Sequence, residues 1–157
     1  MANISEELVT LLYERELTIT TAESCTGGMI ASKLVDVPGV SNVLNEAYIT
    51  YSEESKTRLL GVSEEILASY GVFSEPVAKQ MAVGAAKSAN ADCAISVTGI
   101  AGPDGGSKDK PVGTVYIGYY YQGDVKVVRY QFEGDRESIR EQTVAASIEG
   151  MLEMING

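Results

Sequence analysis

Apolar residues recur every three or four positions in three parts of the chain, the spacing that places them on one face of a helix. In the first part, Glu6 and Glu7 lie near the start, as is typical of a first helical turn. Asp135 precedes the third part and is suited to cap a long C-terminal helix. The second part is the segment of residues 29–34; the apolar positions are Ile4, Leu8, Leu11 and Leu12 in the first part and Val144, Ile148, Met151, Leu152 and Ile155 in the third.

Other apolar segments are short and continuous or rich in β-branched residues, which predicts strands. Residues 93–97 are apolar almost throughout, so we expect a central strand buried on both faces. Residues 122–124 are turn formers between two such segments, which predicts a hairpin. The predicted strands are residues 18–21, 43–51, 93–97, 113–121 and 125–132.

Three short helices are predicted between the second and third strands. Ser52 is expected to cap the first, which ends at Gly61, and Ser63 begins the second, which ends at Gly71. Ser74 begins the third, in which the small residues 82–86 predict close packing against another element. The order of elements predicts a single domain over residues 1–157, a three-layer α/β/α sandwich with a mixed β-sheet. Strand order stays open.

The composition narrows the environment and the partners. Hydrophobic residues make up 45% of the chain, as in globular proteins, and no apolar run approaches the roughly 18 residues of a membrane span. The N-terminal stretch of residues 1–7 carries net negative charge and lacks a signal-peptide pattern, so we expect a cytoplasmic protein. The net charge of −10 argues against nucleic-acid or membrane binding, but does not exclude a small anionic ligand held locally.

The missing residue types narrow the chemistry. The chain contains no histidine, so a Ser-His-Asp triad and a His-bearing zinc site are excluded. Cys25 and Cys93 alone make a poor zinc site and no disulfide framework, which favours a reduced compartment. Any covalent catalysis must therefore use another base, for which lysine and tyrosine are the leading candidates.

The central candidate is Ser24, in the segment Ala22-Glu23-Ser24-Cys25-Thr26-Gly27-Gly28 between a predicted strand and a predicted helix. Backbone N–H groups at such a turn suit an oxyanion, so Ser24 could be a nucleophile. From spacing alone, a plain helix cap is the commoner role for a serine before a helix. Cys25 is a rival nucleophile if the helix N-terminus lowers its pKa, or else a small buried residue.

Other candidates lie at the ends of neighbouring elements. Lys56, if desolvated near Ser24, could act as its base with Tyr51 relaying or positioning the proton; otherwise they are a solvated lysine and a core tyrosine. The glycine-rich residues 98–106 could wrap a phosphate or sugar, or form a long turn. Arg136 and Arg140 share a helical face and could clamp an anion, or pair with neighbouring glutamates. The strand ends predict one shared site for Ser24 and the glycine-rich loop.

These stretches together resemble the CinA C-terminal domain family over nearly the whole chain. The resemblance is carried by residues 22–28, Tyr51-Ser52 with Lys56, Leu60-Gly61-Val62, Thr98-Gly99-Ile100-Ala101-Gly102-Pro103 with Gly105-Gly106, residues 110–115, and Gly134-Asp135-Arg136 with Arg140. It implies a stand-alone nicotinamide-nucleotide amidase that converts nicotinamide mononucleotide and water to nicotinate mononucleotide and ammonia in pyridine-nucleotide recycling. It further implies no metal, no cofactor and a homodimer.

The resemblance also implies residue roles. Ser24 matches the nucleophile, Lys56 the general base and Tyr51 its partner. We expect the turn at Thr26, Gly27 and Gly28 to stabilise the oxyanion. The candidates for binding the rest of the substrate, its ribose phosphate included, are Thr98, Gly99, Gly102, Gly105, Arg136 and Arg140.

Two positions depart from the family pattern. Glu53 stands where asparagine is common, and its carboxylate would favour charged Lys56. Residues 72–73 are Val-Phe in place of a commoner Ala-Val. Two alternatives stay open: a non-catalytic nucleotide-binding or dimerisation module of the same family, and a hydrolase that uses Cys25.

Overall fold

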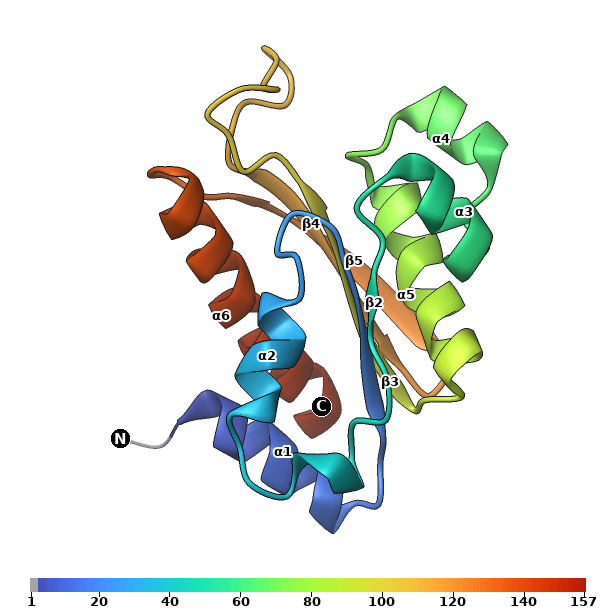
Figure 1. Cartoon of the computed structure of the whole chain (residues 1–157), viewed down its shortest axis with the longest axis vertical. Coiled ribbons are helices and arrows are strands. Elements are labelled where there is room, and N and C mark those ends of the chain that lie inside the picture. Colours follow the sequence, from blue (N-terminus) through green and yellow to red (C-terminus); the bar gives the residue numbers. More distant parts are fainter. Residues whose placement is uncertain (1–2) are drawn as a thin grey trace.

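A five-stranded mixed sheet forms the centre of the computed structural model, which describes residues 3–157 (Figure 1). Met1 and Ala2, part of the N-terminal stretch considered above, lie outside the described residues. The strand order is β2-β1-β3-β4-β5; β1 is parallel to β2 and β3, and the remaining pairs are antiparallel. The strands are β1 Ile19–Glu23, β2 Tyr48–Ile49, β3 Cys93–Gly99, β4 Thr114–Tyr121 and β5 Asp124–Gln131.

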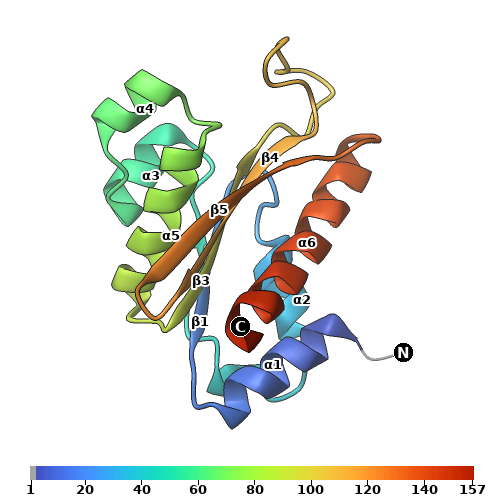
Figure 2. The same ribbon diagram turned by 180° about the vertical axis from the view of Figure 1, so that it is seen from behind.

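Helices cover both faces of the sheet, which confirms the predicted three-layer sandwich. One layer holds α1, α2 and α6 and the other holds α3, α4 and α5, as the front and back views show (Figures 1 and 2). The helices are α1 Ile4–Glu14, α2 Met29–Val35, α3 Glu53–Leu60, α4 Glu64–Tyr70, α5 Glu75–Ala89 and α6 Arg136–Asn156, with a 3-10 turn at Val40–Asn42. Within residues 3–157, no helix has both the length and the apolar character needed to cross a bilayer.

Local sequence signals set several of these boundaries. The side chains of Ser52, Ser63 and Asp135 each accept a hydrogen bond from a backbone N–H in the first turn of α3, α4 and α6. These bonds satisfy N–H groups that the helix itself leaves unpaired. The predicted helix starts at these three residues are therefore confirmed.

The strand predicted for residues 43–51 is wrong over most of its length. Only Tyr48–Ile49 pairs with β1 as a strand. The N–H groups of Val43 and Leu44 both donate to the Val40 carbonyl at 2.9 Å, so this backbone is committed to a tight turn. Leu44 forms a single bridge to Ile19. Val43 and Leu44 therefore pack in the larger hydrophobic cluster without extending the sheet beyond that bridge.

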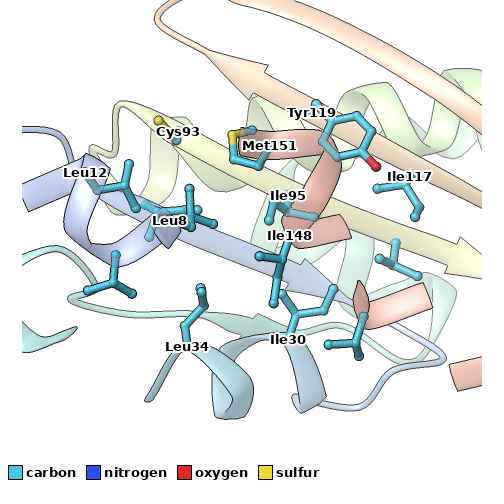
Figure 3. Close-up of a cluster of buried hydrophobic side chains, with 14 of the residues drawn as sticks. Leu8, Leu12, Ile30, Leu34, Cys93, Ile95, Ile117, Tyr119, Ile148 and Met151 are labelled. Carbon is cyan, nitrogen blue, oxygen red and sulfur yellow. The ribbon is translucent and has the colours of Figure 1, made fainter. Parts of the chain in front are cut away.

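Two hydrophobic clusters hold the layers together. The larger lies beneath α1, α2 and α6, where Leu8, Ile30 and Ile148 meet the apolar face of β3 (Figure 3). The smaller lies under α3, α4 and α5. All seven residues of β3 are buried, which confirms the predicted central strand. A Cβ on Gly84 would lie 1.8 Å from the Leu60 carbonyl oxygen, so the close packing predicted for this part of α5 is also confirmed.

The parallel pairing of β1 with β3 fixes where a site can form. Their carboxyl ends meet at one edge of the sheet, so the Ser24 turn and the loop after β3 lie at that edge. Residues at this edge can therefore act together, as in other open α/β sheets.

Candidate active site

Ser24 and Lys56 form a buried pair where β1 ends and α3 begins. The Lys56 Nζ lies 3.1 Å from the Ser24 Oγ, and both residues are buried. The ammonium also donates to the Thr50 carbonyl at 2.6 Å and the Tyr51 carbonyl at 3.4 Å. The Ser52 cap fixes the start of α3, and with it the direction of Lys56 one turn later. Lys56 is thus no solvated surface lysine.

Burial changes the protonation of Lys56. Loss of solvent lowers the pKa of the Lys56 ammonium to about 8, because the interior disfavours its charge. The Glu53 carboxylate opposes this shift and raises the pKa, as expected for an opposite charge nearby. About a tenth of Lys56 is therefore neutral at pH 7, and a neutral amine can accept a proton from a neighbouring hydroxyl.

Glu23, for which the sequence predicts no role, organises the Ser24 turn. Its carboxylate is completely buried and accepts five hydrogen bonds. The hydroxyls of Thr21 and Thr26 donate at 3.0 and 2.6 Å, and the N–H groups of Gly28, Ile30 and Ala31 donate at 3.2, 2.9 and 3.0 Å. The only sign of this role in the sequence is an acidic residue directly before Ser24. Which groups its carboxylate binds depends on how the turn folds.

These bonds limit which N–H groups could face a ligand. Glu23 occupies the N–H groups at the start of α2, and the Gly27 N–H donates to the Ser24 carbonyl at 3.0 Å. The expectation that Gly27 and Gly28 supply oxyanion donors is therefore wrong for this geometry. In the part of the chain that the structure describes, the N–H groups of Cys25 and Thr26 donate to no other residue.

Arg140 reaches the Ser24 turn from α6. Its Nε donates to the Cys25 carbonyl at 2.9 Å and its Nη2 to the Thr26 carbonyl at 3.2 Å. The salt bridge found in residues 3–157 joins Arg58 to Glu54, so Arg140 does not pair with a neighbouring glutamate. Arg140 holds the Ser24 turn through two of the turn's backbone carbonyl groups.

Arg136 lies one turn earlier on α6 and joins two other parts of the site. It donates to the Gly102 carbonyl at 2.7 Å and to the Tyr51 hydroxyl at 3.2 Å. Tyr51 is 62% exposed, so it is no core tyrosine. Its carbonyl accepts a hydrogen bond from Lys56, and its hydroxyl accepts one from Arg136. The structure thus brings Tyr51 to the site without linking its hydroxyl to the Ser24–Lys56 pair.

The glycine-rich segment is divided between strand and loop. Thr98 and Gly99 end β3, and the Thr98 hydroxyl is buried and donates to the Val72 carbonyl at 2.9 Å. Gly102 and Gly105 lie in the following loop with φ of 81° and 96°, a backbone region that favours glycine. Thr98 therefore ties β3 to the segment before α5, while the loop carries the Arg136 contact.

Cys25 does not have the properties of a nucleophile. The side chain belongs to the larger core cluster, and burial raises the pKa of its thiol to about 11. The lowered pKa considered for a helix N-terminus is therefore wrong, because desolvation outweighs the nearby arginines. Cys25 is a small buried residue.

Fold and site together define a three-layer α/β protein with a buried serine–lysine pair at the carboxyl ends of its parallel strands. The chain belongs to the CinA family: the family model described as "CinA C-terminal domain" matches residues 1–155.

Relatives by sequence are longer than this chain. A protein of Clostridium beijerinckii, named as competence-damage inducible, is 52% identical over 147 residues, which cover 94% of this chain and 36% of the relative. A "CinA-like protein" of Kosmotoga olearia is 49% identical over 147 residues, with the same coverage of 94% and 36%. The chain thus spans about a third of the length of these relatives.

Solved structures of the same superfamily share the fold over almost the whole chain. A CinA superfamily protein from Escherichia coli matches with a TM-score of 0.94 and 34% identity, covering 97% of this chain and 88% of the other. The competence/damage inducible protein CihA from Agrobacterium tumefaciens matches with a TM-score of 0.93 and 39% identity, covering 100% and 98%.

Proposed function

We propose that this chain is an amidohydrolase that uses a Ser-Lys pair and converts nicotinamide mononucleotide and water to nicotinate mononucleotide and ammonia. The observation that carries the proposal is the buried Lys56 Nζ at 3.1 Å from the Ser24 Oγ, with its pKa lowered to about 8. The substrate comes from the family resemblance, and the serine–lysine geometry supports the reaction type.

In the first half of the reaction, neutral Lys56 removes the Ser24 proton. The Ser24 Oγ then forms a bond to the carboxamide carbon of the substrate, and the carbonyl becomes an oxyanion. The N–H groups of Cys25 and Thr26 are the free donors beside Ser24, and are therefore our candidates for holding that oxyanion. The tetrahedral intermediate collapses, the C–N bond breaks, and charged Lys56 returns the proton to the departing nitrogen as ammonia forms.

In the second half, water releases the product. Neutral Lys56 takes a proton from water, whose oxygen attacks the acyl carbon, and the Ser24 Oγ leaves and recovers that proton. The carbonyls of Thr50 and Tyr51 hold the Lys56 Nζ in reach of Ser24 throughout. No group other than Ser24, Lys56 and backbone is needed for the proton transfers.

The remaining candidates lie around this pair. Arg136, Tyr51 and the Gly102 carbonyl form one hydrogen-bonded group near the loop that contains Gly105. We assign this group to the nucleotide part of the substrate, because a guanidinium can bind a phosphate. Arg140 contacts two carbonyls of the turn, so we assign it to holding the turn and not to the phosphate.

The test is to incubate the purified protein with nicotinamide mononucleotide and a chelator, and to follow ammonia and nicotinate mononucleotide. Ser24→Ala and Lys56→Met remove the two reacting groups. Ser41→Ala and Lys79→Met make the same changes at exposed positions and serve as matched controls. We expect product from the parent and both controls, and a loss of at least about 10³-fold in both site variants.

The opposite outcomes identify the alternatives. A folded parent that binds the nucleotide and releases no ammonia would favour the non-catalytic module. Activity that survives in Ser24→Ala would refute the serine mechanism.

A further inference from the structure

We propose that Glu23 is a positioning residue that aims the N–H groups of the Ser24 turn at the reacting carbonyl. The inference rests on the proposed amidase function and deepens it. It places Glu23 behind the turn, with no contact to substrate. Its role is to fix the residues that make that contact.

The first support is the number and origin of the groups that Glu23 binds. Its carboxylate receives a hydroxyl from β1, a hydroxyl from the turn and three N–H groups from the start of α2. Its own backbone carbonyl accepts the Thr50 N–H at 2.9 Å. Thr50 in turn holds the Lys56 Nζ through its carbonyl. One residue therefore links the Ser24 turn, α2 and the segment that orients the proposed base.

The second support is that α2 lacks a cap of its own. Gly28 occupies the cap position and provides no side-chain hydrogen bond. Glu23 replaces that cap from five residues upstream and pairs N–H groups that would otherwise be free. A completely buried carboxylate is tolerated only when hydrogen bonds compensate its desolvation, so these five donors are held to a narrow geometry.

The third support is the geometry of Thr26. Its hydroxyl donates to Glu23 at 2.6 Å on one side, and its carbonyl accepts from Arg140 on the other. In a trans peptide the C=O and the following N–H point in opposite directions. Because Arg140 also binds the Cys25 carbonyl, the Thr26 N–H points away from Arg140. The side chain and the two flanking peptides of Thr26 are thus fixed, and its N–H is left free.

Glu23 does not act through the charge of Lys56. The carboxylate that shifts the Lys56 pKa is that of Glu53, not that of Glu23. A change at Glu23 should therefore alter how well the transition state is held, without moving the pH at which Lys56 becomes neutral.

The experiment compares Glu23→Gln and Thr26→Val with the parent. Glu23→Gln keeps the shape but places an amide donor against some of the five donors, and Thr26→Val removes the shortest bond. Thr20→Val is the matched control. Thr20 also lies on β1 and is buried, but its hydroxyl donates to the Glu46 carbonyl and not to Glu23. For each folded variant, kcat, KM and the pH profile are measured with nicotinamide mononucleotide.

We expect kcat to fall about 10- to 100-fold in Glu23→Gln and several-fold in Thr26→Val, since misplaced oxyanion donors cost rates of this order. The KM should stay within about twofold and the pH midpoint should not move, and Thr20→Val should keep the parental kcat. A purely structural Glu23 would lower thermal stability but leave kcat per folded molecule unchanged, and that result would overturn the proposal.

Amide hydrogen exchange tests the same inference without turnover. In Glu23→Gln, exchange at Gly28, Ile30 and Ala31 should accelerate relative to the rest of α2 and to Thr20→Val. Unchanged exchange at these amides would overturn the proposal even if the parent is an active amidase. Accelerated exchange in a parent background that releases no ammonia would instead refute the amidase function and support the structural link from Glu23 to the turn.

Discussion

Replacing Glu53 with glutamine should make Lys56 a better base at neutral pH. With a Lys56 pKa of about 8, about 9% of the side chain is neutral at pH 7 and about 91% at pH 9, so kcat/KM of the parent should rise about tenfold between these values. The Glu53 carboxylate raises that pKa, so its removal lowers the pKa and increases the neutral fraction. The gain at pH 7 cannot exceed about elevenfold, the point at which all Lys56 is neutral.

The assay is ammonia release from nicotinamide mononucleotide between pH 6 and 10. Glu54→Gln removes the same charge from the next position, where Glu54 is exposed and paired with Arg58 at 2.8 Å. We expect the midpoint of the Glu53→Gln profile to move to lower pH and that of Glu54→Gln to stay near the parental value. An unchanged midpoint in Glu53→Gln, or equal shifts in both variants, would refute the electrostatic reasoning.

Three further predictions concern stability and reactivity. Lys56→Met should be inactive yet more stable than the parent at pH 7, by up to about 3 kcal/mol in urea unfolding. Because the folded pKa of Lys56 lies below its ordinary value of 10.5, the penalty for burying its charge is full below pH 8, and the advantage of methionine should disappear toward pH 10.5. An advantage that does not change with pH would contradict this account. Cys25→Ser should retain activity within about threefold, and iodoacetamide should leave the folded parent unmodified at pH 7, because the thiol pKa is about 11. Gly84→Ala should lower the free energy of unfolding by about 1–3 kcal/mol or more, because its Cβ would overlap the Leu60 carbonyl. Lys87→Ala on the same helix should change the free energy of unfolding by less than about 0.5 kcal/mol.

Much of the fold follows from local signals in the sequence. The caps at Ser52, Ser63 and Asp135 mark helix starts that the structure confirms, because each depends on bonds within three residues. The predicted hairpin is also confirmed, with β4 and β5 paired throughout. The strand expected at residues 43–51 fails because apolar composition does not reveal where backbone N–H groups bond.

The site was predictable as a set of residues but not as a geometry. Ser24 and Lys56 were identified, and the structure places them in contact. The Tyr51 hydroxyl is oriented by Arg136, which lies 85 positions later in the chain. The Cys25 carbonyl is bound by Arg140, which lies 115 positions later. The role of Glu23 depends on a turn that folds its carboxylate back beneath α2. No local pattern encodes such contacts.

The contact between Arg140 and the Ser24 turn affects when the turn can form during synthesis of the chain. During synthesis Ser24 and Lys56 emerge before Arg140, which holds the turn from α6 and lies 115 residues after Cys25. A nascent chain that stops before this helix leaves the Cys25 and Thr26 carbonyls without their guanidinium partner. The Ser24 turn therefore gains its two Arg140 hydrogen bonds only after residues 136–156 have been synthesised and α6 has packed.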